Sequence, residues 1–589
     1  QWTAENDIWM DLLGDTRINA LAAYDWVHAT MTPEERRAFL LPVLDYISKA
    51  QPGGEYTFRR TIGGPQDGNY GERALMYFAG LAGHGDGIDD ARCDDFLRRG
   101  AALFVEMMDH RERTSAGSGL LSAITVTYSF GAYPNATFLF LHSWKAAFGD
   151  DLSTRWTQMA DYPTWFDYAM IRKRPGEGFL YFGWGDVGHS TNASSGGLMY
   201  DHLAQSIHFY GRRFPEKARR AYAVLAELPA RHHVFGSTYP FVPFLLTGFD
   251  PASVSQPVEP LPEAPYFHAP SFGLLVMRSG RGPKDTYVSF RCGSSLANHQ
   301  HYDELSFVIY KEGFLALDAG SRTETDHHHA YAAQSVAHNT ILIHEPDEPM
   351  PYFWRAWSYK PDGKTYPNHG GQKDKTAARL LALEDGPGYV YAAADATRSY
   401  AETKSREVVR QVVYIRPDHV VIYDRVASVK DSQTKQFLLH LQNRPEAIGE
   451  QRFRAENGGQ LFIETLLPEQ AAIHLEGGPG REFWASGRNW ELEGGADWEK
   501  QYKVTGRWRL EISTPAPVAS CRFLHVLHAA APSTAVPPAA ARVTTDAEDG
   551  VRLVDAQGRP WTVWFRRDGE VACRLQAPSP VPPPAAPAP

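Results

Sequence analysis

The chain reads Asn298-His299-Gln300-His301-Tyr302-Asp303-Glu304-Leu305-Ser306-Phe307 at its most informative point. It continues through an apolar run to Asp318 and then reaches Ala337-His338-Asn339-Thr340. His299 and His301 lie two residues apart, so on a β-strand their side chains point to the same face. Asp318 follows His301 by 17 residues and His338 follows Asp318 by 20, which leaves room for a strand and a turn in each interval. We therefore expect His301, Asp318 and His338 to converge from adjacent strands.

Two imidazoles and one carboxylate, with a position left for water or substrate, suit a divalent metal ion. Zinc is the first choice, and manganese or calcium is the alternative. His299 would then point at whatever occupies the site, where a neutral imidazole is a good general base. For any one of these histidines a structural role is the alternative, but together they favour a site. We interpret His327-His328-His329 as a loop near the site that adds no ligand.

Composition limits the possible partners. At 589 residues the chain is too long for one ordinary domain. A net charge of −10 argues against a nucleic-acid partner, although local arginine clusters can still hold a polyanion. No run of about 18 apolar residues occurs, so we predict no membrane insertion. The chain begins at Gln1 without Met, and we expect that a leader has been removed and that the protein is periplasmic or secreted.

Residues 1–249 are predicted to form a helical domain. Arg17 to Val27 has apolar residues at helical spacing. Thr32-Pro33-Glu34-Glu35 provides an N-cap, a proline at the first helical position and acids in the first turn. Many helices without interleaved strands predict paired helices that close into a toroid or bundle.

The remainder is predicted to be β-structure. Residues 250–265 are rich in proline and are interpreted as a linker. Short runs of aromatic and β-branched residues follow, such as 285–291 and 419–423. They predict an antiparallel β-sandwich over 266–504, a smaller β domain over 505–576 and a disordered Pro/Ala tail over 577–589. The predicted fold class is therefore α+β and multidomain.

A second group of polar and aromatic residues lies in the helical half. Residues 181–192 form a loop dense in glycine and aromatic residues, including Trp184, a candidate for stacking on substrate. His189 and Asn192 can donate hydrogen bonds, and His202 follows ten residues later on a predicted helix. Helix capping is an equally good interpretation of such residues.

Tyrosines and arginines of the helical half provide further candidates. Tyr239 lies in a turn near the domain boundary, where a phenol can donate a proton to a leaving oxygen. Tyr128 and Tyr133 compete with Tyr239 for that role, and Tyr133 is also a candidate for substrate binding. Core packing is the alternative for each of these tyrosines. Arg60 and Arg172 can bind carboxylate or sulfate bidentately, although a solvated basic surface explains them equally well.

The chain resembles the heparinase II/III-like polysaccharide lyases. The matching strings are 299–307, 313–320 and 338–340, together with the Tyr24-Asp25-Trp26 helix and residues 32–37. The resemblance spans most of the chain and is most specific in the sheet half. It implies an (α/α) toroid followed by antiparallel sheet domains, with the active site between them. It also implies a metal held by His301, Asp318 and His338, with His299 facing the substrate.

The resemblance further implies β-elimination at a 4-linked uronic acid. In such enzymes an Asn or His neutralises the uronate carboxylate, and by position we assign this role to Asn192, His189 or His202. A tyrosine acts as acid or base, and Tyr239 is the assigned residue. The expected substrate is an acidic polysaccharide, with glycosaminoglycans such as heparan sulfate, chondroitin sulfate or hyaluronan favoured over alginate.

Three other functions stay open at this point. A uronyl C5-epimerase would share the abstraction of the C5 proton. A metal-stabilised carbohydrate-binding protein would use the same residues without turnover. A metallohydrolase is disfavoured because the sequence has no HExxH motif.

Overall fold

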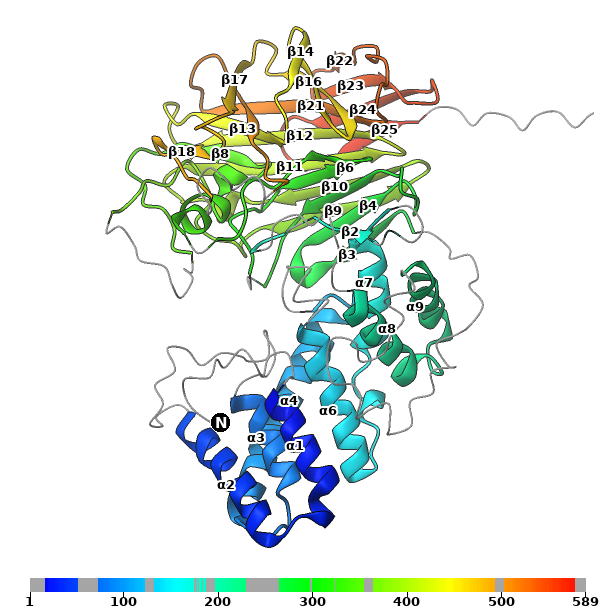
Figure 1. Cartoon of the computed structure of the whole chain (residues 1–589). Coiled ribbons are helices and arrows are strands. Elements are labelled where there is room, and N and C mark those ends of the chain that lie inside the picture. The colour runs from blue at the N-terminus through cyan, green and yellow to red at the C-terminus, as the bar shows by residue number, and fades with distance from the viewer. Residues whose placement is uncertain are drawn as a thin grey trace, which may run out of the picture. The chain divides into compact units, whose positions relative to one another are not determined.

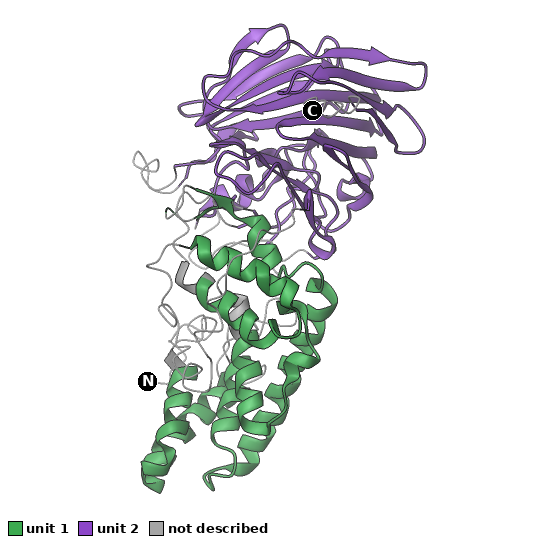
Figure 2. Cartoon of the chain, turned by 90° about the vertical axis from the view of Figure 1, so that its right-hand side faces the viewer, with its two compact units in different colours: residues 1–181, 190–262 green, residues 182–189, 263–589 purple. Residues whose placement is uncertain are grey.

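The chain forms two compact units in its computed structural model, which describes residues 16–50, 72–121, 132–173, 177, 179–182, 184–186, 196–228, 264–296, 299–323, 325–353, 364–492 and 503–577. The helical unit comprises residues 1–181 and 190–262, and the sheet unit comprises residues 182–189 and 263–589 (Figure 2). Eight residues from the helical half of the sequence thus belong to the sheet unit.

The helical unit is built from helices of 8 to 26 residues (Figure 1). Their bounds are α1 (Thr16–Val27), α2 (Pro33–Ala50), α3 (Glu72–Ala82), α4 (Asp90–Ser115), α6 (Ala132–Phe148), α7 (Tyr162–Ala169), α8 (Gly196–Tyr210) and α9 (Pro215–Glu227), and a short ribbon joins β1 (Ile171–Arg172) to β2 (Phe179–Leu180). The predicted start of α2 is confirmed as a capping box. Glu35 N–H donates to Thr32 Oγ1 at 3.2 Å, and Thr32 N–H donates to Glu35 Oε2 at 2.8 Å.

Close packing of α3 on α4 depends on glycine. A Cβ atom at Gly100 would lie 2.3 Å from the backbone nitrogen of Tyr77, and one at Gly80 would lie 2.3 Å from that of Leu97. Only a residue without a side chain lets the two backbones approach this closely.

The sheet unit consists of antiparallel sheets. A five-stranded sheet contains β3 (Tyr266–Ala269), β4 (Leu274–Arg278), β5 (Tyr287–Arg291), β6 (Phe307–Tyr310) and β7 (Phe314–Ala316). An eight-stranded sheet has the order β14 (Glu446–Gly449), β15 (Arg452–Asn457), β16 (Gly459–Leu467), β21 (Ser520–Ala530), β12 (His419–Ser428), β11 (Ser405–Ile415), β10 (Tyr389–Asp395) and β9 (Arg379–Gly386).

Smaller sheets complete this unit. One has the order β17 (Ala472–Gly477), β20 (Trp508–Ser513), β13 (Lys435–Leu441) and β8 (Ile341–Ile343). Another has the order β22 (Ala541–Thr544), β23 (Glu548–Val554), β24 (Pro560–Arg566) and β25 (Cys573–Gln576), and β18 (Trp484–Ala485) pairs with β19 (Arg488–Asn489).

The eight-stranded sheet is buried on both faces because its side chains alternate. Val420 and Ile422 belong to the large core shared with the five-stranded sheet and with β8, β13 and β20. Val421 and Tyr423 point the other way, into a second core with the strands β22 to β25. This period of two is the expected consequence of the pleat.

The predicted fold class, a helical N-terminal region followed by antiparallel sheets, is confirmed. The domain boundary predicted at residues 504–505 is wrong, because β20 and β21 follow it and yet pair with β13 and β12. Among the strands after residue 505, β22 to β25 form a sheet of their own. Residues 250–263 of the predicted linker and 578–589 of the predicted tail lie outside the described residues.

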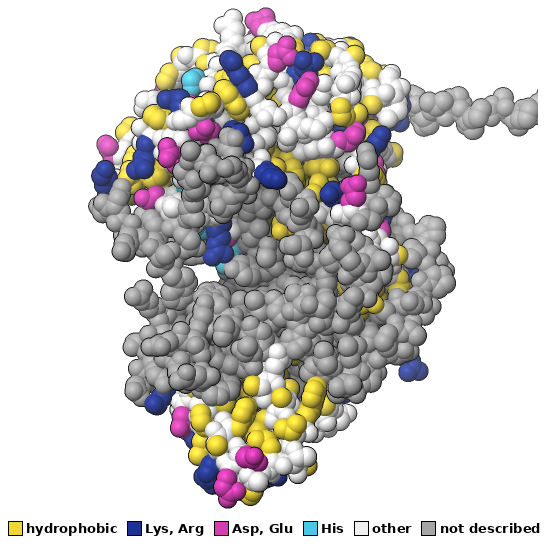
Figure 3. All heavy atoms as spheres, viewed as in Figure 1, with side chains coloured by type: hydrophobic (Ala, Val, Ile, Leu, Met, Phe, Trp, Pro, Cys, Tyr) yellow, Lys and Arg dark blue, Asp and Glu magenta, His cyan; other side chains and the backbone are white. Residues whose placement is uncertain are grey.

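The surface of the sheet unit carries charges of both signs. In Figure 3, lysine and arginine side chains are interspersed with aspartate and glutamate over its visible, described part. Within the described ranges, no helix is both long enough and apolar enough to span a lipid bilayer.

Candidate active site

Three imidazoles surround one buried carboxylate in the sheet unit, that of Asp186. His299 Nδ1 lies 2.6 Å from Asp186 Oδ2, while His301 Nε2 and His328 Nε2 lie 3.3 and 3.2 Å from Oδ1. Burial by itself would raise the pKa of Asp186, but the hydrogen bonds from the three histidines hold that pKa well below its ordinary value. Asp186 is therefore an ionised acceptor at neutral pH.

The five-stranded sheet positions Asp186. The Phe182 ring packs against Tyr287 and Phe314, with centroid separations of 5.7 and 4.8 Å. Trp184 Nε1 donates a hydrogen bond to Ser289 Oγ at 3.3 Å, and Asp186 N–H donates to the His299 carbonyl at 3.3 Å. Trp184 is 2% exposed. The prediction that Trp184 stacks on substrate is therefore corrected, since its ring anchors this segment.

His299 and His301 do not lie on a strand, contrary to the prediction. Residues 299–306 form turns that precede β6 (Phe307–Tyr310). His299 has a φ of 55°, in the left-handed region that non-glycine residues rarely adopt. Backbone strain of this kind costs about 1–3 kcal/mol and clusters at active sites. Both histidines reach Asp186 through this turn and not through the shared face of a strand.

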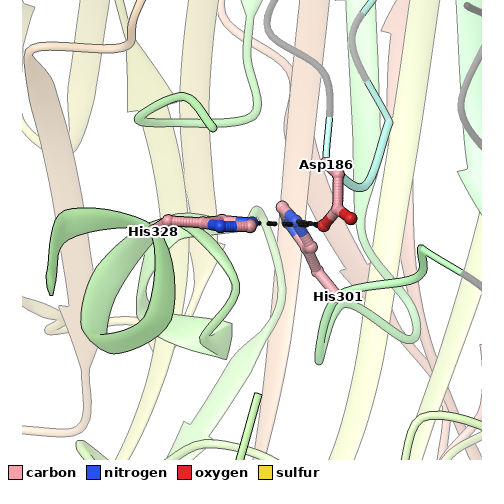
Figure 4. Close-up of side chains that lie close together, drawn as sticks. All are labelled: Asp186, His301 and His328. Carbon is pink, nitrogen blue, oxygen red and sulfur yellow. Dashed lines mark hydrogen bonds and ion pairs between the residues drawn. The ribbon is translucent and has the colours of Figure 1, made fainter. Parts of the chain in front are cut away.

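His328 reaches the carboxylate from a different element. It is the first residue of η8 (His328–Ala332), a π-helical turn, and such turns are frequent at functional sites. Figure 4 shows His301 and His328 directed at Asp186 from a loop and from this turn. The neighbouring histidines turn elsewhere: His327 bonds to the Trp490 carbonyl and His329 to the Phe353 carbonyl, the latter at 2.9 Å. The interpretation of 327–329 as a loop that adds no ligand is wrong for His328.

The predicted metal set is only partly brought together. Asp186, His301 and His328 each offer a ligand atom within 4.8 Å of the other two, and His301, Asp318 and His338 do not form such a group among the described residues. Asp318 and His338 instead bind each other, at 2.6 Å between Oδ1 and Nδ1. The His338 ring lies 5.3 Å from that of His301, between centroids, so this pair adjoins the observed group.

The residues fit a divalent ion. Two imidazoles and a carboxylate, all buried, are a common donor set for zinc and similar ions. His301 Nε2 and His328 Nε2 converge on one oxygen, Asp186 Oδ1, at 3.3 and 3.2 Å, as the ligands of a shared ion would. Burial lowers the pKa of His301 despite its hydrogen bond to Asp186, which keeps the imidazole in the neutral, ligating form.

A lysine that belongs to no sequence motif lies beside this group. The Phe353 ring lies edge-on to His301 and His328, with centroid separations of 5.3 and 5.2 Å. The Lys375 ammonium lies 4.5 Å above the same ring and donates a hydrogen bond to the Gln300 carbonyl at 2.8 Å. Burial lowers the pKa of Lys375, while the charges of Asp186 and Asp303 raise it. No motif surrounds Lys375, so only the fold could reveal it.

Two predicted residues of the helical half are buried away from any substrate. His202 on α8 is fully buried beside Phe138 and Tyr162, and burial lowers its pKa to about 3. Arg172 is buried and forms ion pairs with Asp167 and Glu227. The catalytic role predicted for His202 and the substrate-binding role predicted for Arg172 are therefore corrected, because a core imidazole and a neutralised guanidinium present nothing to a substrate.

The other predicted residues cannot be placed. Arg60, His189, Asn192 and Tyr239 lie outside the described residues, and Tyr133 lies in α6 with its side chain outside the description. Their roles stay predictions.

Comparison with known proteins finds a family model that matches part of the sheet unit and solved structures of similar fold. Residues 261–514 match the family model "Heparinase II/III-like, C-terminal". The chain is similar in fold to a heparinase III crystal structure, with a TM-score of 0.59 and 14% identity over 95% of this chain and 74% of that one. A heparan sulfate lyase, HepC from Pedobacter heparinus, matches with a TM-score of 0.54 and 13% identity over 92% and 69% of the two chains. No curated protein sequence matches the chain.

Proposed function

We propose that the chain is a polysaccharide lyase that cleaves uronate-containing polymers by β-elimination. The match of residues 261–514 to the heparinase II/III-like C-terminal family model supports this proposal. One observation carries the proposal. A partly exposed imidazole, that of His299, is held at 2.6 Å by a fully buried, ionised carboxylate, that of Asp186. This is the arrangement of a general base with the group that orients it.

The hydrogen bond between His299 and Asp186 determines which nitrogen of His299 can accept a proton. The Nδ1–H of His299 donates to Asp186, so proton transfer falls to Nε2. Asp186 stays ionised and stabilises the imidazolium that forms when Nε2 removes the proton from C5 of the uronate. The electron pair of the C5–H bond forms the C4–C5 double bond, and the C4–O4 bond breaks to release the O4 of the leaving sugar.

Abstraction of the C5 proton requires that the charge developing on the uronate carboxylate be stabilised. The Lys375 ammonium, beside Phe353, supplies positive charge next to the cluster. A divalent ion, zinc by the donor set, would be held by Asp186, His301 and His328 and would supply further positive charge when bound. The predicted roles of Tyr239 as acid and of Asn192 or His189 as carboxylate ligands complete the proposal.

Sulfated glycosaminoglycans are the first substrate class to test. The two solved structures most useful for comparison are those of a heparinase III and a heparan sulfate lyase, and they support this choice over alginate. A periplasmic or secreted location is part of the proposal, because such polymers lie outside the cytoplasm.

The experiment is incubation of the full chain with heparan sulfate, heparin, chondroitin sulfate, hyaluronan and alginate while ultraviolet absorbance is followed. The expected result is a rise in absorbance from the unsaturated uronate on at least one of these polymers. Exchange of the C5 hydrogen with solvent deuterium without a rise in absorbance would instead indicate an epimerase. Binding without either change would indicate a carbohydrate-binding protein, and both outcomes would overturn the proposal.

A further inference from the structure

A second group of one aspartate and two histidines lies within the eight-stranded sheet. Asp418 immediately precedes β12, His419 begins that strand, and His528 lies near the end of β21. His419 and His528 are direct partners in the antiparallel pairing of β12 with β21, although 109 residues separate them in sequence. All three residues are buried, and each offers a ligand atom within 4.8 Å of the other two.

The separations within this group suit a shared ion. His419 Nδ1 lies 2.8 Å from Asp418 Oδ1, and His528 Nε2 lies 3.7 Å from Asp418 Oδ2. Two ligand atoms that each lie about 2.0 Å from a tetrahedral zinc ion are about 3.3 Å apart. The observed values fall on either side of that distance, so small side-chain movements would close the site around an ion.

Two further features lack an explanation if the group is only part of the core. Among the described residues His528 Nδ1 is buried without a hydrogen-bond partner, and the His419 and His528 rings stack with centroids 4.1 Å apart at 10°. The two histidines also line a cavity of about 30 Å³ together with Arg452 and Glu464. A space of that size can hold one water molecule, and its lining joins these four polar side chains to apolar ones such as Phe462 and Leu553.

We propose that Asp418, His419 and His528 bind a divalent transition-metal ion, zinc by the nature of the donors, and that the adjoining cavity holds a water at the fourth position. The ion ties Asp418 and the start of β12 to the end of β21. The lone pair of an imidazole nitrogen lies in the ring plane, so an ion shared by both rings requires them to tilt. Metal binding therefore opens the 10° angle between the stacked rings.

The test measures the zinc content of the full chain by inductively coupled plasma mass spectrometry. The protein is first equilibrated with zinc, and the unbound ion is then removed. His528→Gln keeps most of the side-chain volume and is expected to lower zinc content by about one ion per chain relative to the unmodified protein. His474→Gln is the matched control, since His474 is 63% exposed and belongs to neither group, and it is expected to change nothing. Equal zinc content in a folded His528→Gln protein would overturn the proposal.

A second measurement covers the case in which His528→Gln does not fold. In His328→Ala, which lacks a residue of the first group, added zinc is expected to raise Tm by several degrees through the second group. Combining that variant with Asp418→Asn should abolish the rise. A Tm of His328→Ala that zinc leaves unchanged, or a rise that survives Asp418→Asn, would contradict the proposal. Neither result bears on lyase activity, so this inference stands or falls apart from the proposed function.

Discussion

The two His/Asp groups of the sheet unit have the same composition and different supports. Asp186, His301 and His328 come from a loop segment, a turn and a π-helical turn, whereas His419 and His528 are paired residues of neighbouring strands. The loop-borne group has a further imidazole, that of His299, with 17% of its side chain exposed. Loops can present such a base to a substrate, whereas paired strands fix the positions of residues that only bind an ion. We therefore assign chemistry to the first group and stabilisation to the second.

The loop-borne group is nevertheless anchored to the sheet by one side chain. Arg410 on β11 is fully buried, and its Nε and Nη2 donate to Asp424 at 2.7 and 3.0 Å. Its Nη1 donates to the Leu305 and Asn339 carbonyls at 2.7 and 2.6 Å. These carbonyls lie in the two segments that carry His301 and His338. The strand-borne group needs no such anchor, because the β-ladder holds its residues.

Asp186→Asn is expected to give the largest change. The amide can donate to His299 Nδ1 and stabilise the wrong tautomer, so kcat should fall by about 10³- to 10⁴-fold. Initial rates of unsaturated-uronate formation measure this, with Tm as the check on folding. A rate within tenfold of that of the unmodified protein would show that Asp186 has a structural role only. The loop-borne group would then not differ in function from the strand-borne group.

Arg410→Met tests the anchor. Removing one partner of a buried ion pair leaves Asp424 uncompensated, and the free energy of unfolding should fall by about 3–5 kcal/mol. Chemical denaturation measures it. Arg379→Met is the control: Arg379 pairs with Asp395 while 72% exposed, and its loss should cost less than about 1 kcal/mol. Equal losses in the two variants would mean that Arg410 does not anchor these segments.

His328→Ala and His528→Gln separate the two groups directly. His328→Ala should lower kcat/KM by about 100-fold because it removes a candidate metal ligand and a hydrogen bond to Asp186. His528→Gln should keep the rate within about twofold and lower Tm by a few degrees. The assay is the same ultraviolet time course, paired with a thermal scan. If His528→Gln lost activity as His328→Ala does, the strand-borne group would share in the chemistry.

Glu304→Gln should give the smallest effect. Burial raises the pKa of Glu304 to about 7, against the N–H donors of Ser294 and Gln300 and the charge of Arg291. A carboxyl group whose pKa is higher in the folded than in the unfolded protein stabilises the fold. This contribution is complete at a pH below the unfolded-state pKa and is lost as the pH rises through the folded-state pKa of about 7. The free energy of unfolding should fall with pH in this range, by at most about 1.4 kcal/mol per pH unit.

Chemical denaturation of the unmodified protein and of Glu304→Gln at about pH 5, 6, 7 and 8 measures this contribution. Glu304→Gln should flatten the dependence of the free energy of unfolding on pH. Parallel profiles for the two proteins would show that Glu304 is not the residue responsible.

Local sequence signals predicted much of the fold. The predicted N-cap at Thr32 forms, and the run 285–291 contains β5 (Tyr287–Arg291). The boundary at 504–505 failed because no local signal shows that β20 and β21 return to pair with β13 and β12. Pairing between strands distant in sequence depends on the whole sheet.

The candidate site was harder to predict for the same reason. His301 could be selected because the motif concentrates imidazoles, but Asp186 lies 115 residues earlier in sequence. The sequence predicts that the loop of residues 181–192 belongs to the helical half, whereas its Phe182 and Trp184 pack on the five-stranded sheet. His328 could not be distinguished from His327 and His329, since a π-helical turn directs the three rings to different partners.

The most direct test of the central claim is the rate of unsaturated-uronate formation by His299→Ala, with and without added imidazole, on the best polymer of the panel. The account predicts a loss of about 10²- to 10⁴-fold in a protein that still folds, and partial recovery when imidazole supplies the missing base. A folded His299→Ala protein that cleaves the polymer as fast as the unmodified chain would contradict it.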